Sequence, residues 1–330
     1  MKIKIGDITK IRTGKLDANA ADENGQYPFF TCSKEPLKIN TYSYDCECVL
    51  VAGNGDLNVK YYNGKFDAYQ RTYIIEDDSD GLLFMPYLYF FMESYIDELR
   101  KQSIGGVIKY IKLKNLTDAL IELPSIEVQR KIVNIISKSK EIVRRKENEF
   151  ELLDELVRAR FVEMFGEIED CDRWESKIWN EVVTIKNGRD YKKVLVSDGG
   201  YPVVGTGGEI ARASKYLCPE NTIVVGRKGS INNPMLMKEK FWNVDTAFGV
   251  IPNSDYLHYQ YFYYFCKFYN FMKLNKATTL PSTTKADLLK IRINIPPLEL
   301  QNQFASFVEQ IDKSRLLSNH SLFLIKSLTF

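Results

Sequence analysis

The 330-residue chain contains only two histidines and six cysteines, and the cysteines are scattered along the sequence. The closest pair, Cys46 and Cys48, lacks the CxxC spacing of zinc knuckles and redox motifs. Two histidines are too few for a His-rich metal site. We therefore expect reduced cysteines, no bound metal and no cofactor.

Long apolar runs are also missing, since none approaches the roughly 20 residues of a membrane-spanning helix. Residues 1–6 have no long apolar stretch behind their lysines, as a secretory signal peptide would have. We therefore expect a cytoplasmic protein without a membrane partner. Because 45 Lys and Arg residues nearly balance 43 Asp and Glu residues, any nucleic-acid partner must be held by local basic patches.

Catalytic signatures are largely absent. Residues 226–230 (GRKGS) do not have the GxxxxGK[ST] spacing of a P-loop ATPase. Residues 295–298 (IPPL) lack the Asn or Asp and the aromatic residue of the adenine methyltransferase motif, and no GxSxG, HExxH or kinase pattern occurs. We expect no catalysis by this chain, with a metal nuclease site built from scattered acids as the minor alternative.

The chain repeats itself once. At an offset of 174 the matching segments are 6–14 with 180–188, 25–30 with 199–204, 51–58 with 225–232, and 87–91 with 261–265. At an offset of 172, residues 121–129 (IELPSIEVQ) match residues 293–301 (INIPPLELQ). Matches in the same order at nearly constant offset indicate a tandem duplication, and the long period is typical of a domain plus a connector.

Both copies predict the same elements. A short helical or extended segment leads to a Tyr-Pro turn at residues 27–28 and 201–202. β-branched runs followed by turn residues predict strands at 48–52, 69–75, 222–225 and 244–251. Aromatic helices at 87–95 and 256–271 follow, and their spacing favours a core or a protein interface over a base-stacking surface.

A long helix ends each copy. From Ser125 to about Phe165 there is no Pro or Gly, and Gly166 stands where a C-terminal cap belongs. The second helix begins at Pro297, a residue favoured in the first helical turn. Apolar residues recur near heptad spacing, although residues 146–149 interrupt it. We expect the helices to pack antiparallel, to hold the two globular copies apart by up to about 60 Å, and to relate them by an approximate two-fold.

Basic residues gather at matching places in the two copies. Residues 100–115 carry five positive charges and no acid, and residues 267–292 carry six against Asp287 alone. Such patches beside polar loops suit phosphate contacts with base readout, while ordinary solvated faces are the alternative. Two globular copies related by a two-fold could enter adjacent major grooves, in which the half-sites lie about 34 Å apart. Because the two copies differ in sequence, they would read different half-sites.

The element Leu/Ile-Pro-(Ser/Pro)-(Ile/Leu)-Glu-(Val/Leu)-Gln, present at residues 123–129 and 295–301, resembles the conserved-region signature of type I restriction–modification specificity (S) subunits. The resemblance covers essentially the whole chain. It implies an α+β fold with two duplicated target-recognition domains, residues 1–122 and 171–294. It also implies two long spacer helices, residues 123–170 and 295–330, which form an antiparallel coiled coil.

The same resemblance implies a function without catalysis. Such a subunit reads a bipartite, asymmetric target in double-stranded DNA and recruits two modification (adenine-N6 methyltransferase) subunits. The assembly can also bind the restriction translocase-nuclease subunits. The alternative from a different class is a coiled-coil scaffold that bridges two protein partners without contacting DNA.

Candidate DNA contacts come from the loops. Arg227 and Lys228 lie between Gly226 and Gly229, where small residues let the backbone approach a ligand, and an Arg there could bind guanine or a phosphate bidentately. Asn54 and Asn58 could read adenine edges. The other candidates are Gln70, Arg71, Lys109, Tyr110, Lys112, Thr206, Thr278, Thr279, Ser282, Thr283 and Lys285. Plain turns and surface pairs are the alternative for each, and a plain turn is favoured for Thr206.

Overall fold

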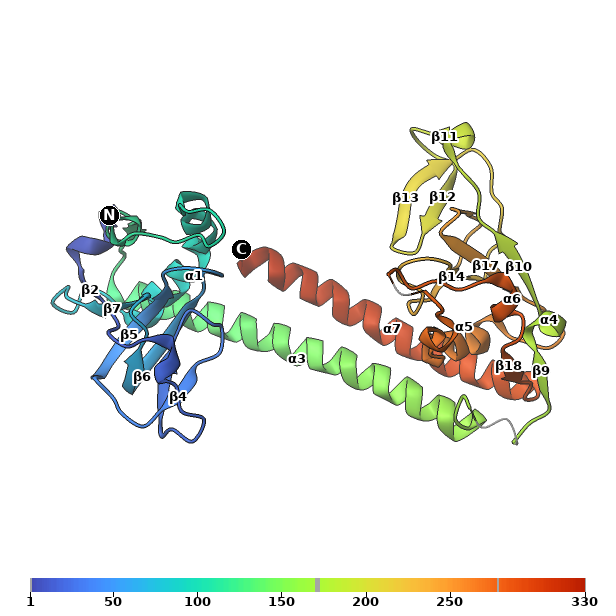
Figure 1. The fold of residues 1–330 in the computed structure, drawn as a ribbon, viewed down its shortest axis with the longest axis horizontal. Coiled ribbons are helices and arrows are strands. Elements are labelled where there is room, and N and C mark those ends of the chain that lie inside the picture. Colours follow the sequence, from blue (N-terminus) through green and yellow to red (C-terminus); the bar gives the residue numbers. More distant parts are fainter. Residues whose placement is uncertain (1, 170–172, 278, 330) are drawn as a thin grey trace. The chain divides into compact units, whose positions relative to one another are not determined.

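The computed structural model describes residues 2–169, 173–277 and 279–329 (Figure 1). In the last helix it describes side chains through Leu316 and at Ser318. The chain divides into two compact units, residues 1–143 with 328–330, and residues 144–327.

The first unit is built on a six-stranded sheet with the strand order β2-β7-β5-β6-β3-β4. All neighbouring strands are antiparallel except β3 and β6, which are parallel. Its strands are β2 (Thr9–Thr13), β3 (Tyr27–Phe30), β4 (Leu37–Ile39), β5 (Tyr44–Ala52), β6 (Val59–Ala68) and β7 (Thr72–Asp77). The helices are α1 (Met85–Gln102), α2 (Leu113–Thr117) and the start of α3 (Ile126–Phe165), and β1 (Lys2–Lys4) pairs with β8 (Leu120–Glu122).

The second unit contains two four-stranded sheets, ordered β10-β17-β14-β15 and β11-β13-β12-β16, and the pair β18-β9. In chain order its strands begin with β9 (Ser176–Ile178), β10 (Val183–Asn187), β11 (Leu195–Val196), β12 (Tyr201–Gly205) and β13 (Gly208–Ala213). They continue with β14 (Thr222–Gly226), β15 (Met235–Met237), β16 (Trp242–Asn243), β17 (Ala247–Pro252) and β18 (Arg292–Asn294). The helices are α4 (Trp179–Val182), α5 (Tyr259–Phe268), α6 (Lys285–Leu288) and α7 (Leu298–Thr329).

The two units repeat the same order of elements, which confirms the predicted tandem duplication and α+β class. The strand neighbours β2-β7-β5-β6 correspond to β10-β17-β14-β15. The long helices begin at Ile126 and Leu298, at the offset of 172 found in the sequence. Helices α2 and α6 begin at Leu113 and Lys285, again 172 residues apart.

The predicted Tyr-Pro turns are wrong, because Pro28 and Pro202 lie inside β3 and β12. A proline has no N–H and fits a strand only where that side of the backbone lacks a partner. In each strand the proline pairs with one neighbour, while the parallel pairing on the other side starts later, at Phe29 and Val203. Both prolines therefore occupy a strand position at which no second ladder bond is needed.

The strands at 48–52 and 222–225 are confirmed as parts of β5 and β14. The strands predicted at 69–75 and 244–251 begin three residues later than expected, at Thr72 and Ala247, because the preceding residues turn the chain. The second aromatic helix is shorter than predicted, since His258 caps its start and Tyr269 ends it.

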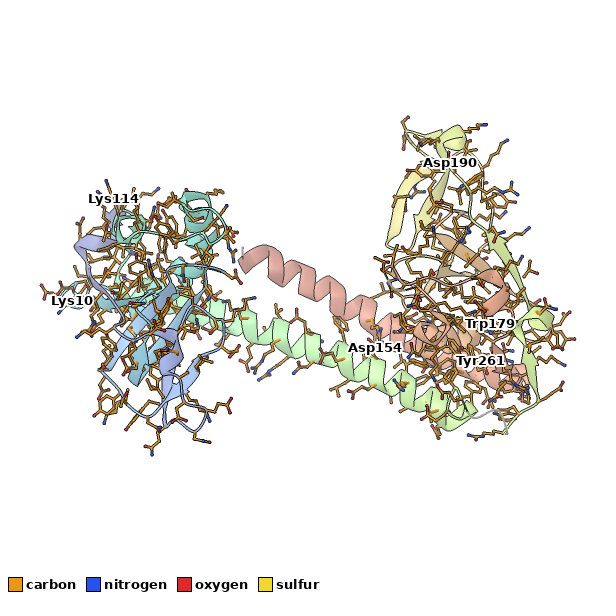
Figure 2. All side chains as sticks on the ribbon, viewed as in Figure 1. Lys10, Lys114, Asp154, Trp179, Asp190 and Tyr261 are labelled. Carbon is orange, nitrogen blue, oxygen red and sulfur yellow. The ribbon has the colours of Figure 1, made fainter. Side chains whose placement is uncertain are left out.

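The sheets supply the centre of each core. Residues 48–52 of β5 are at most 1% exposed, so the central strand reads as a continuous apolar run instead of an alternating one. In the second unit the aromatic side chains of α5 pack in the core with the sheet, where Tyr261 and Phe262 are buried. Trp179 of α4 is buried in the same core (Figure 2 labels Trp179 and Tyr261). In α1 the core is made by Leu88 and its aliphatic neighbours, while the helix's tyrosines are only partly buried.

The glutamine that ends the sequence signature anchors the start of α3. Gln129 is fully buried. Its Oε1 accepts a hydrogen bond from the Phe84 amide at 2.8 Å, and its Nε2 donates to the carbonyls of Leu82 and Pro124, both at 2.8 Å. One side chain thus ties the helix start to the segment that leads into α1.

Gln301 repeats this arrangement at the start of α7. It is fully buried, accepts from the His258 amide at 2.7 Å, and donates to the carbonyls of Tyr256 and Pro296 at 2.9 and 2.8 Å. A residue with both a carbonyl and an NH₂ group is required to satisfy one donor and two acceptors. The signature's final Gln is therefore structural in both copies.

Within the second unit α3 and α7 pack side by side and antiparallel (Figure 1). Phe304, early in α7, packs on Phe161 of α3 with ring centroids 5.5 Å apart. Farther along α7, Arg315 bonds Asp154 of α3 at 3.0 Å. The partners' numbers fall on α3 as they rise on α7, which confirms the predicted antiparallel packing of the two helices for this unit.

The polar interruption at residues 146–149 also meets a polar partner across the pair. Lys146 Nζ donates to Ser318 Oγ at 3.2 Å, and Ser318 Oγ donates to Glu149 Oε1 at 3.1 Å. A polar residue in a helix pair is satisfied in only one register, so this contact favours the observed alignment. Helix α3 then ends as predicted, with Gly166 at a φ of 87° and its amide bonded to the Val162 carbonyl at 2.8 Å.

The start of α5 provides a pH-dependent contact. His258 is the N-cap, and its Nδ1 accepts a hydrogen bond from the Gln260 amide at 3.2 Å. Burial lowers the pKa of His258 below its ordinary value of 6.5, an effect partly opposed by Glu309. Protonation would remove the acceptor and place a cation at the positive end of the helix.

We expect this contact to stabilise the second unit fully above pH 6.5 and to be lost as the pH falls through the lowered folded-state pKa. Asparagine caps helices but does not titrate, so His258→Asn should lose about 1 kcal/mol less stability than the parent protein on acidification. Thermal melts at neutral and mildly acidic pH measure the difference. Equal pH slopes in both proteins would contradict the assignment.

Candidate nucleic-acid interface

Two of the predicted DNA-contacting loops of the first unit are paired with each other. The Gly55 amide donates to the Lys109 carbonyl, and the Ile111 amide donates to the Gly53 carbonyl, both at 2.9 Å. Asn54 and Tyr110 face each other between these bonds as an antiparallel bridge. Predicted contacts from segments more than 50 residues apart in the sequence therefore lie side by side.

The second unit repeats this pairing in the same register. The Gly229 amide donates to the Pro281 carbonyl at 2.9 Å, the Thr283 amide donates to the Arg227 carbonyl at 3.0 Å, and Lys228 and Ser282 form the bridge. We call each pairing a loop ladder: residues 53–55 with 109–111 in the first unit, and 227–229 with 281–283 in the second. The sequence offsets place these residues at equivalent positions.

A third segment joins each loop ladder. In the first unit the Gly53 amide donates to the Arg71 carbonyl at 2.8 Å, and in the second the Arg227 amide donates to the Thr246 carbonyl at 2.8 Å. A Cβ on Gly53 would lie 2.3 Å from the Arg71 carbonyl oxygen, so only glycine permits this approach. The turn that holds Gln70 and Arg71 is thereby fixed beside Asn54, Lys109 and Tyr110.

Exposed cations border both loop ladders. Arg71, Lys109 and Lys112 are exposed in the first unit, and Arg227, Lys228 and Lys285 in the second. Arg227 is oriented by a long bond to the Asp245 carbonyl at 3.4 Å and lies 5.9 Å from the ring of Phe248. Lys285 donates to the Ile185 carbonyl at 3.0 Å, which directs its ammonium group along the protein surface.

Two of the predicted contacts are bound internally. Asn58 Nδ2 donates to the carbonyls of Cys32 and Asp56 at 2.8 and 2.9 Å, and its Oδ1 accepts from Lys60, whose pKa burial lowers. Thr283 is 3% exposed, and its hydroxyl donates to the Gly226 carbonyl at 2.8 Å. These side chains hold the loops in shape. Contact of either one with DNA stays a prediction: the Thr283 hydroxyl would have to leave the Gly226 carbonyl, and Asn58 would have to break its bonds to read a base.

The two glycines that border Arg227 and Lys228 also have structural reasons. A Cβ on Gly226 would lie 2.7 Å from the Ser230 carbonyl oxygen, so the chain's own backbone already requires the small residue. Gly229 has a φ of 82° and open space around it. Its backbone conformation alone favours glycine there.

The remaining predicted DNA contacts lie close to the second loop ladder, except for one that falls outside the residues that the structure describes. Thr206 is in the two-residue turn between β12 and β13, and the preceding Gly205 lies near Val244 and Thr246, beside the Arg227 loop. Thr279 is exposed and Ser282 is half-buried. Thr278 lies outside the described residues. The sequence analysis did not include the turn at Asp245 and Thr246 among the predicted contacts. Asp245 lies 174 residues after Arg71, so the repeat offset could have identified it as the equivalent of Arg71.

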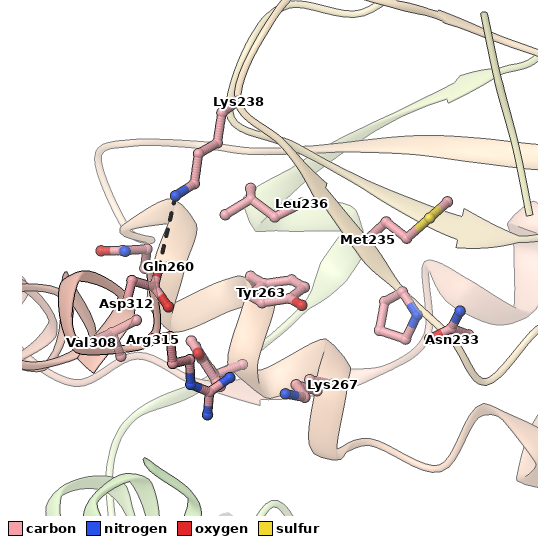
Figure 3. Close-up of a pocket in the computed structure, with 12 residues that line it drawn as sticks. Asn233, Met235, Leu236, Lys238, Gln260, Tyr263, Lys267, Val308, Asp312 and Arg315 are labelled. Atoms are coloured by element: carbon pink, nitrogen blue, oxygen red, sulfur yellow. Dashed lines mark ion pairs between the residues drawn. The ribbon is translucent and has the colours of Figure 1, made fainter. Parts of the chain in front are cut away.

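A separate pocket of about 410 Å³ lies between β15, α5 and α7 (Figure 3). Lys238, Lys267 and Arg315 line it, but Lys238 pairs with Asp312 at 3.9 Å, and the other two each bond Asp154 at 3.0 Å. Each of these cations is therefore paired within the protein, and Lys267 and Arg315 share the carboxylate of Asp154. The pocket contains no residue of the second loop ladder.

Other kinds of site are not seen in the part of the chain that the structure describes. There, no three His, Cys, Asp or Glu side chains gather as a metal-binding group would. Over the same residues, no helix is long and apolar enough to cross a bilayer.

Known proteins resemble the chain over its full length. A solved S subunit of a type I restriction–modification system from M. genitalium superposes with a TM-score of 0.71 at 16% identity, covering 100% of this chain and 93% of that one. A chain from a structural study of complex assembly and conformational transition of the type I R-M system has a TM-score of 0.53 at 15% identity, covering 100% and 95%. At such identities these likenesses establish the fold alone.

The chain is also similar in sequence to specificity subunits of type I restriction enzymes. The Type I restriction enzyme EcoDI specificity subunit from Escherichia coli is 45% identical over 123 residues, which span 37% of this chain but only 27% of that protein. The MjaVIII specificity subunit from Methanocaldococcus jannaschii is 22% identical over 94% of this chain and 85% of its own length. The family model "Type I restriction modification DNA specificity domain" matches residues 1–152 and again 172–325. Since both copies match, the chain belongs to the type I restriction–modification DNA specificity family.

Proposed function

We propose that the chain is the DNA-recognition subunit of a type I restriction–modification complex and has no catalysis of its own. In this proposal residues 1–122 and 171–294 are target-recognition domains, each reading one half of a bipartite, asymmetric target. Residues 123–170 and 295–330 are the spacer helices that set the distance between the half-sites. The family membership supports this role over that of a scaffold without DNA contact.

The observation that carries the proposal is one backbone frame with two sets of side chains. At equivalent positions the loop ladders and their turns present Asn54 and Lys228, Arg71 and Asp245, and Tyr110 and Ser282. The same frame would enter the same groove in the same way, while unlike side chains would read unlike bases. Exposed cations beside each frame would supply the sequence-independent phosphate contacts.

The proposed partners are double-stranded DNA, two adenine-N6 methyltransferase subunits and restriction translocase-nuclease subunits, assembled in the cytoplasm. Helix α3 offers a surface for protein partners, because Leu152 and Leu156 are 63% and 47% exposed on adjacent turns. Exposed apolar side chains that share one helix face are typical of an interface. The chain itself would hold neither a metal nor a cofactor.

The proposal is tested in cells that express the chain with its methyltransferase partner. Methylation mapping is expected to find a single split motif with two unlike halves. The purified complex is expected to bind that motif with an affinity that falls steeply as salt is raised, by about 10³-fold or more between 50 and 200 mM for six phosphate contacts. Absent or salt-insensitive binding would instead support the scaffold.

A further inference from the structure

An exposed aliphatic side chain stands directly before a strand of each loop ladder, at the same position in both units. Ile108 is 63% exposed and Leu280 is 54% exposed, and the offset of 172 makes them equivalent. Each directly precedes the residue whose carbonyl accepts a ladder bond, Lys109 or Pro281. In the first unit the neighbouring Val107 is completely exposed as well.

We call Ile108 and Leu280 the tips of their loops. The first tip, Ile108, is held at the end of a narrow loop. Ile104 and Tyr110 exchange two backbone hydrogen bonds, of 3.0 and 2.8 Å, and so close the base of the loop. Gly105 follows with a φ of 117°, a conformation that other residues rarely adopt. Ile108 is therefore presented to solvent by a constrained loop.

The second tip is closed by a side chain instead of a backbone pair. Asn275 Oδ1 accepts from the amides of Ala277 and Ser282, at 3.1 and 3.0 Å, and Asn275 Nδ2 donates to the Ala277 carbonyl at 3.1 Å. The two units thus use unlike contacts to hold the segment before the ladder, and each places an aliphatic residue directly before it. The exposed part of an aliphatic side chain contributes to stability or binding only where it is removed from water.

The surroundings favour DNA as the surface that covers these residues. Lys109 and Lys112 flank the first tip, and Lys228, across the ladder from Ser282, lies beside the second. Cations around a small apolar tip complement a groove lined by phosphates. Side chains such as Ile and Leu also act as wedges between base steps.

We propose that Ile108 and Leu280 each enter the duplex as an apolar wedge at one base step of their own half-site. The inference rests on the proposed function. The polar residues of the two ladders differ while the aliphatic position is kept, so this contact serves both half-sites whatever their sequence. It therefore deforms the DNA and does not read it, unlike a contact to a thymine methyl group.

The test uses the complete complex with its methyltransferase partner and a duplex that carries the mapped target. The variants are Ile108→Ser and Leu280→Ser. Leu82→Ser and Leu195→Ser are matched controls, because their parent side chains are 60% and 54% exposed but do not adjoin a loop ladder. 2-Aminopurine is placed at successive steps of each half-site, away from the adenines that are methylated.

We expect each wedge variant to bind about tenfold more weakly with an unchanged salt dependence, since no phosphate contact is lost. The parent complex should raise 2-aminopurine fluorescence at one step in each half-site, and each variant should lose the signal in its own half only. A mismatch at that step should restore the variant's affinity, because unstacking is then already favoured.

Three results would overturn the wedge while leaving the proposed function intact. They are parent-like binding of both variants with no fluorescent step, loss of assembly with the methyltransferase, and an affinity loss reproduced by replacing thymine with deoxyuridine. The last two would assign the tips to protein docking and to base readout. Failure of the parent complex to bind any split target would refute the proposed function itself, and the wedge with it.

Discussion

Replacing Gln301 with leucine is expected to destabilise the second unit by about 3–5 kcal/mol. The substitution fills similar space but leaves the His258 amide and the carbonyls of Tyr256 and Pro296 without their partner. Each buried polar group left unsatisfied costs about 1–3 kcal/mol. The loss would be a large fraction of the stability of an ordinary domain.

Thermal and denaturant unfolding of the full chain measure the effect. The matched control is Gln303→Leu, because Gln303 lies two residues along α7 and is exposed. Gln129→Leu should destabilise the first unit in the same way, through Phe84, Leu82 and Pro124. If Gln301→Leu and Gln303→Leu unfold at the same temperature, the buried amide does not have the structural role assigned to it.

Exchanging residues 1–122 for the corresponding domain of another family member is expected to change one half of the DNA target and leave the other half unaltered. Each loop ladder is complete within its own unit. Across the exchange boundary, Gln129 binds only the backbone groups of Leu82 and Phe84, which a foreign domain also supplies. Methylation mapping in cells reads both halves at once.

A point variant in the second unit tests recognition of the other half of the target. Arg227→Ala should weaken recognition of the unaltered half by about 1–3 kcal/mol if the guanidinium reads a base. Lys193→Ala is the control, because Lys193 is exposed beside β11, which joins the β12–β13 hairpin at the end opposite Thr206. A domain exchange that alters both halves, or neither, would contradict independent reading by the two units.

Much of the architecture could be predicted because it depends on short-range pattern. The absence of Pro and Gly from 125 to 165, with Gly166 after it, predicts a helix whose observed bounds are Ile126–Phe165. The constant offsets predict the duplication because equal sequences form equal elements. The Tyr-Pro dipeptides were misread because turn propensity is local, whereas a proline's place in a strand depends on whether a neighbour pairs there.

The candidate site was predicted only as separate loops. Nothing in the spacing of Gly53, Arg71 and Lys109 indicates that two backbone bonds, from Gly53 to Arg71 and from Gly55 to Lys109, bring them together. Nor could the sequence separate Thr283, which is buried, from exposed Thr279 nearby. Both distinctions depend on which segments meet after folding.

By itself, the sequence determined the duplication, the order of the main elements, the bounds of the first long helix, and the family, because periodicity, caps and repeated motifs act over a few residues. The tertiary structure alone decided which polar side chains are used to hold loops and which are left for a ligand. It also decided that Ile108 and Leu280 share one exposed position. Burial and hydrogen bonding between distant segments are properties of the folded chain, since each depends on partners far away in the sequence.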